Sequence, residues 1–222
     1  MLRILIEIDT QDVKQFMVFD KTVQEAHITF LEKTLSPERY HHSLGVMQVM
    51  LELSSIYSLK PEQAMMAGLL HDTAKELRHE QQLELAEEAK LEFVEPCEKL
   101  PIYLHAPIGA YLAARDLGVT DPLVLDAIAA HSFSAGMNNF NAPLSQCLRF
   151  ADLLAPISEW PGMKKFKNVV YSGSAEEAHL LQCGWLMEFF QEKQVPIHPN
   201  LVREYETLSK KLGVSKDFFV RW

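Results

Sequence analysis

The sequence predicts an all-α protein, a helical bundle with a group of polar residues at its centre. Apolar residues recur every three to four positions through most of the chain between residues 21 and 212, which is the spacing of one helix face. Histidines and aspartates stand repeatedly on these apolar stripes. Residues 1–12 alternate as a strand would, but no second strand follows to pair with them. We therefore expect an N-terminal extension over residues 1–20 and one bundle over residues 21–222.

Composition excludes several classes of protein. The 222 residues, 48% of them hydrophobic, suffice for one large domain with its own core. With 21 basic and 30 acidic residues, the net charge of −9 offers no general attraction for nucleic acid or for an anionic membrane surface. No window holds the roughly 18 apolar residues of a membrane span. The three cysteines lack CxxC spacing, which is typical of a reducing compartment. We expect a cytoplasmic protein without nucleic-acid or membrane partners.

The first two helices are expected over residues 21–35 and 37–57. Ser36 is a suitable N-cap for the second helix, and Pro37 suits its first turn. His42 lies on the inward-facing stripe of that helix, because the residues three, four, seven and eleven positions later are small or apolar: Gly45, Val46, Val49 and Leu53.

The third helix, beginning at Pro61, carries His71 near its end. Three small residues share the face of this histidine and would let a neighbouring helix approach beside it: Ala64, Ala67 and Gly68. Asp72 follows His71 directly, and Lys75 lies one turn further on. The charged stretch over residues 76–98 predicts a solvated helix without chemistry.

Two further helices each place a histidine on an apolar face. His105 shares its stripe with Ile102, Ile108, Gly109 and Leu112. Pro107 is tolerable in that helix only in the first turn. Asp121 and Pro122 start the next helix, which carries His131 at its C-terminal end in line with Val124, Ala127 and Ile128.

The rest of the chain supplies one more inward-facing polar residue. A turn-rich loop is expected over residues 132–143, followed by a helix that leads to Asp152. Residues 160–162 then break the chain, before a basic cluster that we assign to solvent: Lys164, Lys165 and Lys167. Helices over residues 175–193 and 200–212 complete the bundle. The other histidines are assigned to surface or capping positions: His27, His41, His79, His179 and His198.

Six polar residues on or beside these stripes form a candidate metal site: His42, His71, Asp72, His105, His131 and Asp152. A single histidine on an apolar face is more often a hydrogen-bonded core residue. Burying six polar groups without partners would cost several kcal/mol, and a shared metal centre removes that cost. Imidazole and carboxylate ligands suit iron, manganese or zinc. Neighbours on a helix diverge by about 100°, so His71 and Asp72 converge only at a helix end or on two ions bridged by the carboxylate.

The order of these residues resembles the HD-domain metal-dependent phosphohydrolase superfamily, in which an early histidine, a His-Asp pair and a late aspartate bind metal. His42, His71, Asp72 and Asp152 match that pattern. More narrowly, five segments look like the symmetrical bis(5'-nucleosyl)-tetraphosphatase branch: RYHHSLGV (39–46), AGLLHDTAK (67–75), LHAPIGA (104–110), AIAAHS (127–132) and RFAD (149–152). The resemblance implies an HD-domain helical bundle with two metal ions at its centre. Iron is the first choice and manganese or zinc the alternatives, with His105 and His131 completing the ligand set.

The same branch implies cleavage of diadenosine tetraphosphate into two molecules of ADP. By this resemblance a metal-bound hydroxide attacks phosphorus, and Asp72 and Lys75 are catalytic. Lys75 is also expected to bind substrate together with Arg39, which opens the first of the matching segments. The expected partner is therefore a nucleotide or dinucleoside polyphosphate, and the resemblance leaves a homodimer open.

The chain departs from the family after its late aspartate. The family continues with glutamate-proline and then arginine, whereas Ala155 and Ser158 stand at those positions here. The loop after His131 reads HSFSAGM instead of the usual threonine-glycine pattern. Both departures bear on substrate recognition more than on metal binding. Three alternatives therefore stay open: hydrolysis of another nucleotide or phosphomonoester, a catalytically silent nucleotide- or metal-binding protein, and a core in which the histidines only donate and accept hydrogen bonds.

Overall fold

The computed structural model of the chain describes residues 21–133, 140–155, 160 and 162–214. The secondary structure of these residues is entirely helical, which confirms the all-α prediction. The elements, in chain order, are α2 (Lys21–Thr34), α3 (Pro37–Ile56), α4 (Pro61–Leu70), α5 (His79–Glu88), the 3₁₀ helix η1 (Pro96–Lys99), α6 (Pro101–Arg115), α7 (Pro122–Ala130), α8 (Pro143–Leu154), α9 (Met163–Tyr171), α10 (Ala175–Glu192) and α11 (Pro199–Leu212). The predicted extension at residues 1–20 lies outside the described residues.

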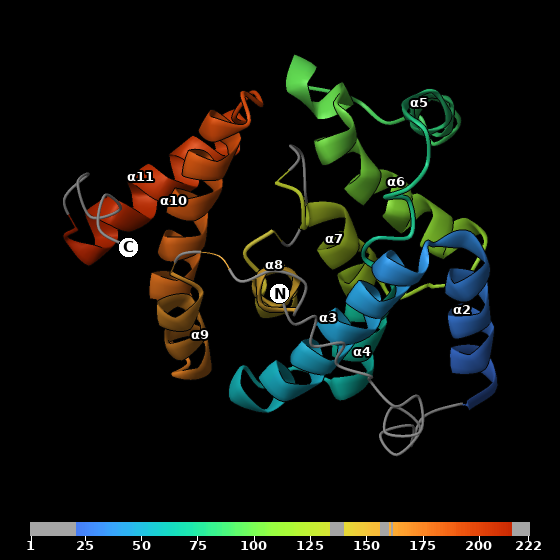
Figure 1. Ribbon diagram of the computed structural model, residues 1–222, viewed down its shortest axis with the longest axis horizontal. Helices are drawn as coiled ribbons and strands as arrows, with labels where there is room; N and C mark the ends of the chain where they lie inside the picture. Colours follow the sequence, from blue (N-terminus) through green and yellow to red (C-terminus); the bar gives the residue numbers. More distant parts are fainter. Residues whose placement is uncertain (1–20, 134–139, 156–159, 161, 215–222) are drawn as a thin grey trace, which may run out of the picture.

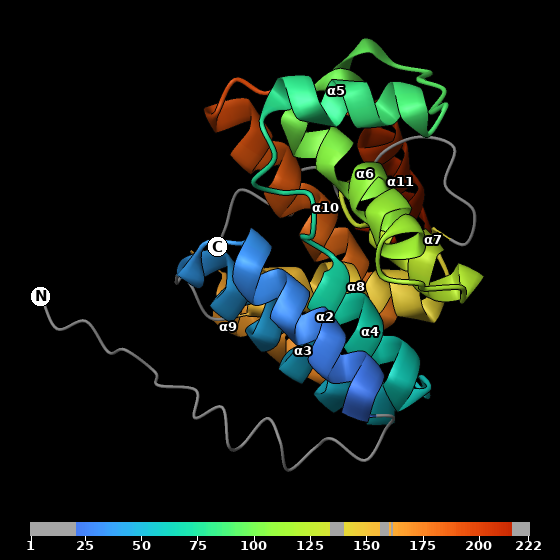
Figure 2. The ribbon, with the colours of Figure 1, turned by 90° about the vertical axis from the view of Figure 1, so that its right-hand side faces the viewer.

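Helix α8 is the central element of the bundle. It contacts α3, α4, α7, α9 and α10, and Figure 1 shows it end-on in the middle of the molecule. Its residues Leu148, Phe150 and Ala151 are fully buried, as expected for a helix at the centre of a bundle. Figure 2 shows α5 lying across α6 at one end of the molecule and α2 lying along α3 at the other. The core therefore surrounds the helix that carries Asp152.

Helices α3 and α4 approach each other closely at Gly68, three residues before His71. A Cβ atom at Gly68 of α4 would lie 2.7 Å from the Cα of Met47 in α3, so only glycine fits there. The prediction that small residues on this face admit a neighbouring helix is confirmed. Ser36 caps α3 as predicted, because its side chain accepts a hydrogen bond from the backbone N–H of Arg39 at 3.3 Å.

The charged stretch 76–98 differs from the single solvated helix that was predicted. Helix α5 ends at Glu88, and Lys90 adopts a left-handed conformation with φ of 52°. The chain then crosses α6, because three apolar side chains pack against that helix: Leu85, Leu91 and Phe93. Glu98 is buried and accepts a hydrogen bond from His198 at 2.8 Å. This carboxylate therefore joins the start of α6 to α11 and does not face solvent.

Pro107 was predicted to lie in the first turn of its helix, which is wrong. Helix α6 begins at Pro101, so Pro107 stands in the second turn and has no N–H to donate to the carbonyl of Tyr103. The hydroxyl of Ser132 donates to that oxygen instead, at 2.8 Å. The residues that follow α7 thus supply a hydrogen bond that the proline removes from α6.

Three histidines assigned to surface or capping positions are buried. His27 contacts the carbonyl oxygen of Leu117 through Nε2 at 3.0 Å, and His179 packs against two phenylalanine rings. The surface assignment is therefore wrong for both, because their helices turn these positions toward neighbouring elements. His198 caps α11 by accepting a hydrogen bond from the N–H of Asn200, as the capping assignment predicted.

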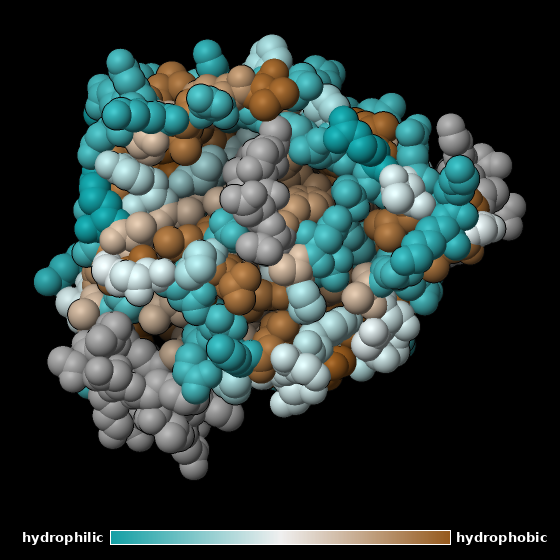
Figure 3. All heavy atoms as spheres, turned by 180° about the vertical axis from the view of Figure 1, so that it is seen from behind, coloured by the Kyte–Doolittle hydropathy of each residue, from teal (hydrophilic) through white to brown (hydrophobic). Residues whose placement is uncertain are grey.

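The surface mixes polar and apolar side chains. Figure 3 shows the face opposite to that of Figure 1, where hydrophilic and hydrophobic residues are interspersed. The exposed large apolar residues lie on separate elements: Ile56, Leu83, Val94, Leu123 and Leu212. No helix in the described part of the chain combines the length and the apolar content that a membrane span needs.

Candidate metal centre

The structure brings all six predicted site residues together. They come from five places in the bundle: His42 from α3, His71 and Asp72 from the end of α4, His105 from α6, His131 from the end of α7, and Asp152 from α8. Two overlapping groups result, one of His42, His71 and Asp72 and the other of Asp72, His105 and His131. The ligand atoms within each group lie within 4.8 Å of one another. Asp72 belongs to both groups, which is the position of a bridging carboxylate.

The end of α4 explains how His71 and Asp72 face one centre. Leu70 is the last helical residue, and His71 is the C-cap with helical dihedrals, so the regular helix ends directly before the two side chains. Nε2 of His71 lies 3.5 Å from an oxygen of Asp72 and 3.5 Å from an oxygen of Asp152. The expectation that these neighbours converge only at a helix end agrees with this geometry.

Three of the imidazoles are oriented by the backbone of their own helices. Nδ1 of His71, His105 and His131 bonds to a carbonyl oxygen three or four residues earlier, at 2.9, 3.0 and 2.7 Å: Gly68, Pro101 and Ile128, respectively. A carbonyl only accepts, so Nδ1 carries the hydrogen and Nε2 of the neutral ring presents a lone pair. Such backbone contacts commonly orient metal-binding histidines.

The Nε2 atoms of His71, His105 and His131 lack enough hydrogen-bond donors, which favours a bound cation. Nε2 of His105 and Nε2 of His131 lie 2.9 Å apart, so two lone pairs face each other in the neutral tautomers. Nζ of Lys75 lies 3.0 Å from Nε2 of His105, and no contact of this ammonium with the ring of His131 relieves the second lone pair among the described hydrogen bonds. Nε2 of His71 is buried and has no hydrogen-bond partner among the described residues. The donor set therefore fits metal ions, which would accept these lone pairs.

The pKa values of the two carboxylates and of His71 also favour a bound cation. Burial opposes the charged form of Asp72, but His71 and Lys75 hold the pKa of its carboxyl well below the usual range. The hydrogen bond from His42 and the nearby ring of His71 do the same for Asp152 against the effect of burial. Burial lowers the pKa of the His71 ring, yet the two carboxylates outweigh it and raise that pKa to about 10. The space in front of His71 Nε2 is thus strongly negative.

The other two rings stay neutral. Burial, reinforced by the charge of Lys75, holds the pKa of His105 well below its ordinary value, and burial also lowers the pKa of His131. The ionised carboxylates and the neutral rings of His105 and His131 are in the protonation states that bind metal, and a metal ion would replace the second proton of the His71 ring.

Two basic side chains flank the carboxylate of Asp72. Nη1 of Arg39 donates to one oxygen at 2.7 Å, and Nζ of Lys75 lies 3.8 Å from the other. Both side chains are 31% exposed, so each also reaches the solvent side of the centre. The contact between Arg39 and Asp72 was not foreseen, because it joins residues on different helices.

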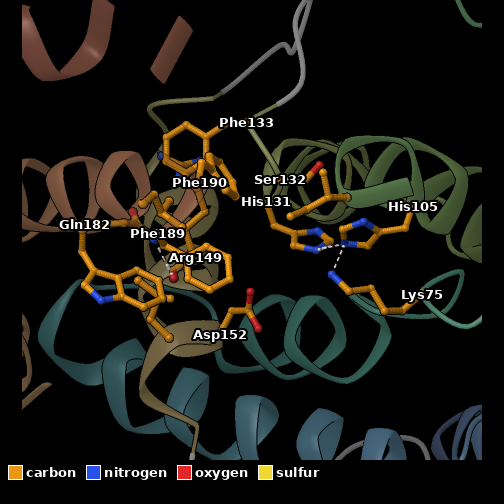
Figure 4. A pocket seen from close by; sticks show the side chains of 14 residues that line it. Lys75, His105, His131, Ser132, Phe133, Arg149, Asp152, Gln182, Phe189 and Phe190 are labelled. Atoms are coloured by element: carbon orange, nitrogen blue, oxygen red, sulfur yellow. Dashed lines mark hydrogen bonds between the residues drawn. The ribbon is translucent and has the colours of Figure 1, made fainter. Parts of the chain in front are cut away.

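A cavity of about 200 Å³ opens beside the centre. Lys75, His105, His131 and Asp152 line one side, and Figure 4 shows them across from an aromatic wall. That wall comes mainly from α10 and includes Trp185, Phe189 and Phe190, with Phe133 and Arg149 beside it. The rings of Trp185 and Phe189 are stacked, with centroids 5.3 Å apart. The sequence predicted the helix over residues 175–193 but not the place of Trp185 and Phe189 beside a pocket.

The departures after Asp152 are only partly described. Ala155 is buried at the end of α8, while Ser158 lies outside the described residues. Most of the loop after His131, residues 134–139, is also outside them.

Comparisons with known proteins agree with the geometry of the centre. Residues 39–157 match the model of the HD domain. The protein named symmetrical bis(5'-nucleosyl)-tetraphosphatase in Bacillus subtilis is 29% identical over 189 residues, covering 83% of this chain and 97% of that protein. The protein of the same name in Halalkalibacterium halodurans is 28% identical over 174 residues, covering 78% of this chain and 90% of that protein. A crystal structure of a predicted HD superfamily hydrolase involved in NAD metabolism from Clostridium acetobutylicum is similar, with a TM-score of 0.76 and 28% identity. That similarity covers 85% of this chain and 97% of the other.

Proposed function

The chain belongs to the HD-domain family and is a phosphohydrolase of that family, and we propose that it cleaves diadenosine tetraphosphate symmetrically into two molecules of ADP. The observation that carries this proposal is a pair of metal-binding groups sharing Asp72 and opening into a pocket with an aromatic wall. The names of two relatives that span most of the chain support the choice of substrate.

We further propose that the six clustered residues hold two metal ions, with iron as the first choice and manganese or zinc as alternatives. The ions would lower the pKa of a water molecule and polarise phosphoryl oxygens. Asp72 belongs to both groups of ligands and would offer one carboxylate oxygen to each of them. Because backbone carbonyls fix the rings of His71, His105 and His131, little reorganisation accompanies binding of the ions.

The basic residues act on the phosphoryl group. Nζ of Lys75 stands at the edge of the centre, where negative charge develops on phosphoryl oxygens as the bond breaks. Arg39 donates to one oxygen of Asp72, and its partly exposed side chain has further N–H groups that can bind an anionic substrate. The half-buried rings of Trp185 and Phe189 offer a surface for stacking a nucleobase.

The reaction consumes one water molecule. Its oxygen bonds to one of the two central phosphorus atoms, and the P–O bond to the bridging oxygen breaks. That oxygen leaves with the second ADP, and the proton of the water goes to solvent or to the leaving phosphate. Both products are ADP, which distinguishes this reaction from asymmetric cleavage to AMP and ATP.

Chromatography of the products tests the proposal. Iron-loaded protein is incubated with diadenosine tetraphosphate, beside the variants His42→Ala and His41→Ala. His41 is the matched control, since it is the same residue type one position away and is exposed. We expect ADP alone from the wild type and from His41→Ala, and none from His42→Ala. AMP with ATP would contradict the assignment, and so would the absence of product from metal-replete protein. Hydrolysis of another nucleotide, without hydrolysis of diadenosine tetraphosphate, would assign the site to that other substrate.

A further inference from the structure

A buried arginine lies in the wall of the same pocket and takes no part in the site described above. Arg149 of α8 is 1% exposed and lines the cavity together with Asp152 and the aromatic residues of α10. Nη1 donates to the carbonyl oxygen of Phe140 at 3.0 Å. Nε and Nη2 are buried and have no hydrogen-bond partner among the described residues. One complete edge of the guanidinium therefore lacks an acceptor.

The surroundings hold the guanidinium in place without neutralising it. Its central carbon lies 4.0 Å from the ring centroid of Phe140 and 5.2 Å from that of Phe133. Burial lowers the pKa of Arg149 to about 10, and the charge of Glu204 offsets only part of that effect. The group thus keeps its charge at neutral pH. A buried charge without a partner destabilises a fold unless something else compensates it.

The unpartnered edge has a defined chemistry. Nε and Nη2 donate side by side, and this fork matches two oxygens of a phosphate or carboxylate. Gln182 of α10 donates to the backbone carbonyl of Arg149 at 2.8 Å, which ties the aromatic wall to α8 beside the guanidinium. The arrangement is rigid because both the backbone and the ring faces around Arg149 are fixed.

The Nε–Nη2 edge of Arg149 belongs to a residue that lies close to the candidate metal centre. Arg149 and Asp152 are three residues apart in one helix, and such residues have Cβ atoms about 5–6 Å apart on the same face. Figure 4 shows Arg149 with Phe189 and Gln182 on one side of the pocket and Lys75 with His105 on the other. An anion at Arg149 therefore lies next to the metal centre, on the side of the aromatic wall.

We propose that Arg149 is a substrate-binding residue whose Nε–Nη2 edge holds a phosphate that does not react, next to the phosphoryl group at the metal centre. The assignment rests on the proposed function in so far as this phosphate belongs to a nucleotide bound in the pocket. A purely structural arginine would only stack on Phe133 and Phe140 and tether the carbonyl of Phe140. The two roles predict different effects on binding and on stability.

Calorimetric titration with ADP and with adenosine separates these roles. The metal-loaded wild type is compared with Arg149→Met, which keeps an unbranched apolar side chain at this position and removes the charge and the guanidinium. We expect affinity for ADP to fall about 10- to 100-fold, the effect of losing charge-assisted hydrogen bonds. Affinity for adenosine should stay within about twofold. Arg115→Met is the matched control, because Arg115 also lies over an aromatic ring, that of Tyr111, but outside the pocket, and it should leave both affinities unchanged.

Thermal unfolding of the ligand-free protein gives a second readout. Since Arg149→Met removes a buried charge without an ionic partner, its Tm should equal or exceed that of the wild type. A lower Tm with an unchanged ratio of ADP to adenosine affinity would overturn the proposal and assign Arg149 a structural role. If Arg149→Met does not fold, Arg149→Lys decides the matter, because it keeps the charge and loses the fork. An ADP affinity equal to that of the wild type would then refute bidentate binding, and a fall of about fivefold or more would support it.

The binding test of Arg149 does not depend on which nucleotide the protein hydrolyses. Failure of the wild type to cleave diadenosine tetraphosphate would refute the proposed function alone. The comparison of ADP with adenosine would still decide whether Arg149 holds a phosphate.

Discussion

The substitution Gly68→Ala tests whether the contact of α3 with α4 sets the geometry of the metal centre. The added Cβ would lie 2.7 Å from the Cα of Met47 and 3.0 Å from its backbone nitrogen. Both are backbone atoms, so no change of rotamer relieves the contact. Ordinary contacts of a Cβ begin at 3.4 Å, and the helices must therefore separate locally by 3.4 − 2.7, about 0.7 Å.

This separation exceeds what a metal site tolerates. His42 belongs to α3 and His71 follows α4, so the two rings move apart with their helices. Metal–ligand distances vary by only about 0.2 Å around their preferred values. We expect Gly68→Ala to weaken metal binding by about tenfold or more. Overpacking costs about 1–3 kcal/mol and the better helix propensity of alanine returns about 1 kcal/mol, so the net loss of stability is about 1 kcal/mol. The Tm should fall by about 2–4 °C.

The assay is calorimetric titration of metal-free protein with manganese, with thermal unfolding of the same samples. Gly213→Ala is the control, because Gly213 has φ of 65° and its Cβ would meet open space. Alanine in that left-handed conformation costs about 1–2 kcal/mol and leaves the contact of α3 with α4 unchanged. Wild-type affinity in Gly68→Ala would refute the reasoning, as would an equal loss of affinity in Gly213→Ala.

Three further predictions follow from the contacts described above. Metal at 100 times its Kd should stabilise the wild type by about 2.7 kcal/mol, and calorimetric scans should show no such shift for Asp72→Asn. Ser132→Ala should cost about 1 kcal/mol in urea unfolding, because it removes the donor to the carbonyl of Tyr103. The cost should shrink in a Pro107→Ala background, where the backbone N–H returns, and an equal cost in both backgrounds would disprove the coupling. Burial lowers the pKa of His179 to about 3, below the ordinary 6.5, so the unfolded chain binds more protons between these values. Stability should fall by up to about 1.4 kcal/mol per pH unit as pH drops below 6.5, and His179→Leu should flatten urea-derived stabilities between pH 7.5 and 5.

Helix starts were predictable because their causes are local. Ser36 bonds to a backbone N–H three residues on, and Asp121 bonds to one two residues on. Each is followed by a proline whose fixed φ suits the first turn. Such interactions lie within one stretch of sequence and need no tertiary contact.

Elements shaped by packing between distant segments were predicted less well. Helix α5 ends early because Leu91 and Phe93 pack against α6, which periodicity within α5 does not reveal. Helix α9 was missed, since its exposed lysines dominate the stretch and only Phe166 and Val170 are buried there. The hydrogen bond from the side chain of His198 to Glu98 joins residues 100 positions apart and has no local sequence pattern.

The candidate site shows the same division. Each proposed ligand stands on or beside an apolar stripe, and stripes of neighbouring helices in one bundle face a shared core. The gathering of His42, His105 and His131 with the two aspartates could therefore be inferred. The hydrogen bond from Arg39 to Asp72 and the place of Trp185 in a pocket depend on how the helices pack in three dimensions. The spacing of these residues in the sequence does not predict either feature.

The two sides of the pocket have separate origins in the chain, which bears on how such enzymes diverge. The HD-domain match ends at residue 157, whereas α10 begins at Ala175 and supplies most of the aromatic wall. Under the proposed function, mutations in α10 would change the aromatic surface for a nucleobase and leave the six proposed metal ligands unaltered. A lineage can therefore change its preferred nucleotide and retain its hydrolytic chemistry. Under the proposed function, the segment that matches the family carries the hydrolytic residues, and α10 adds a surface that contributes to the choice of nucleotide.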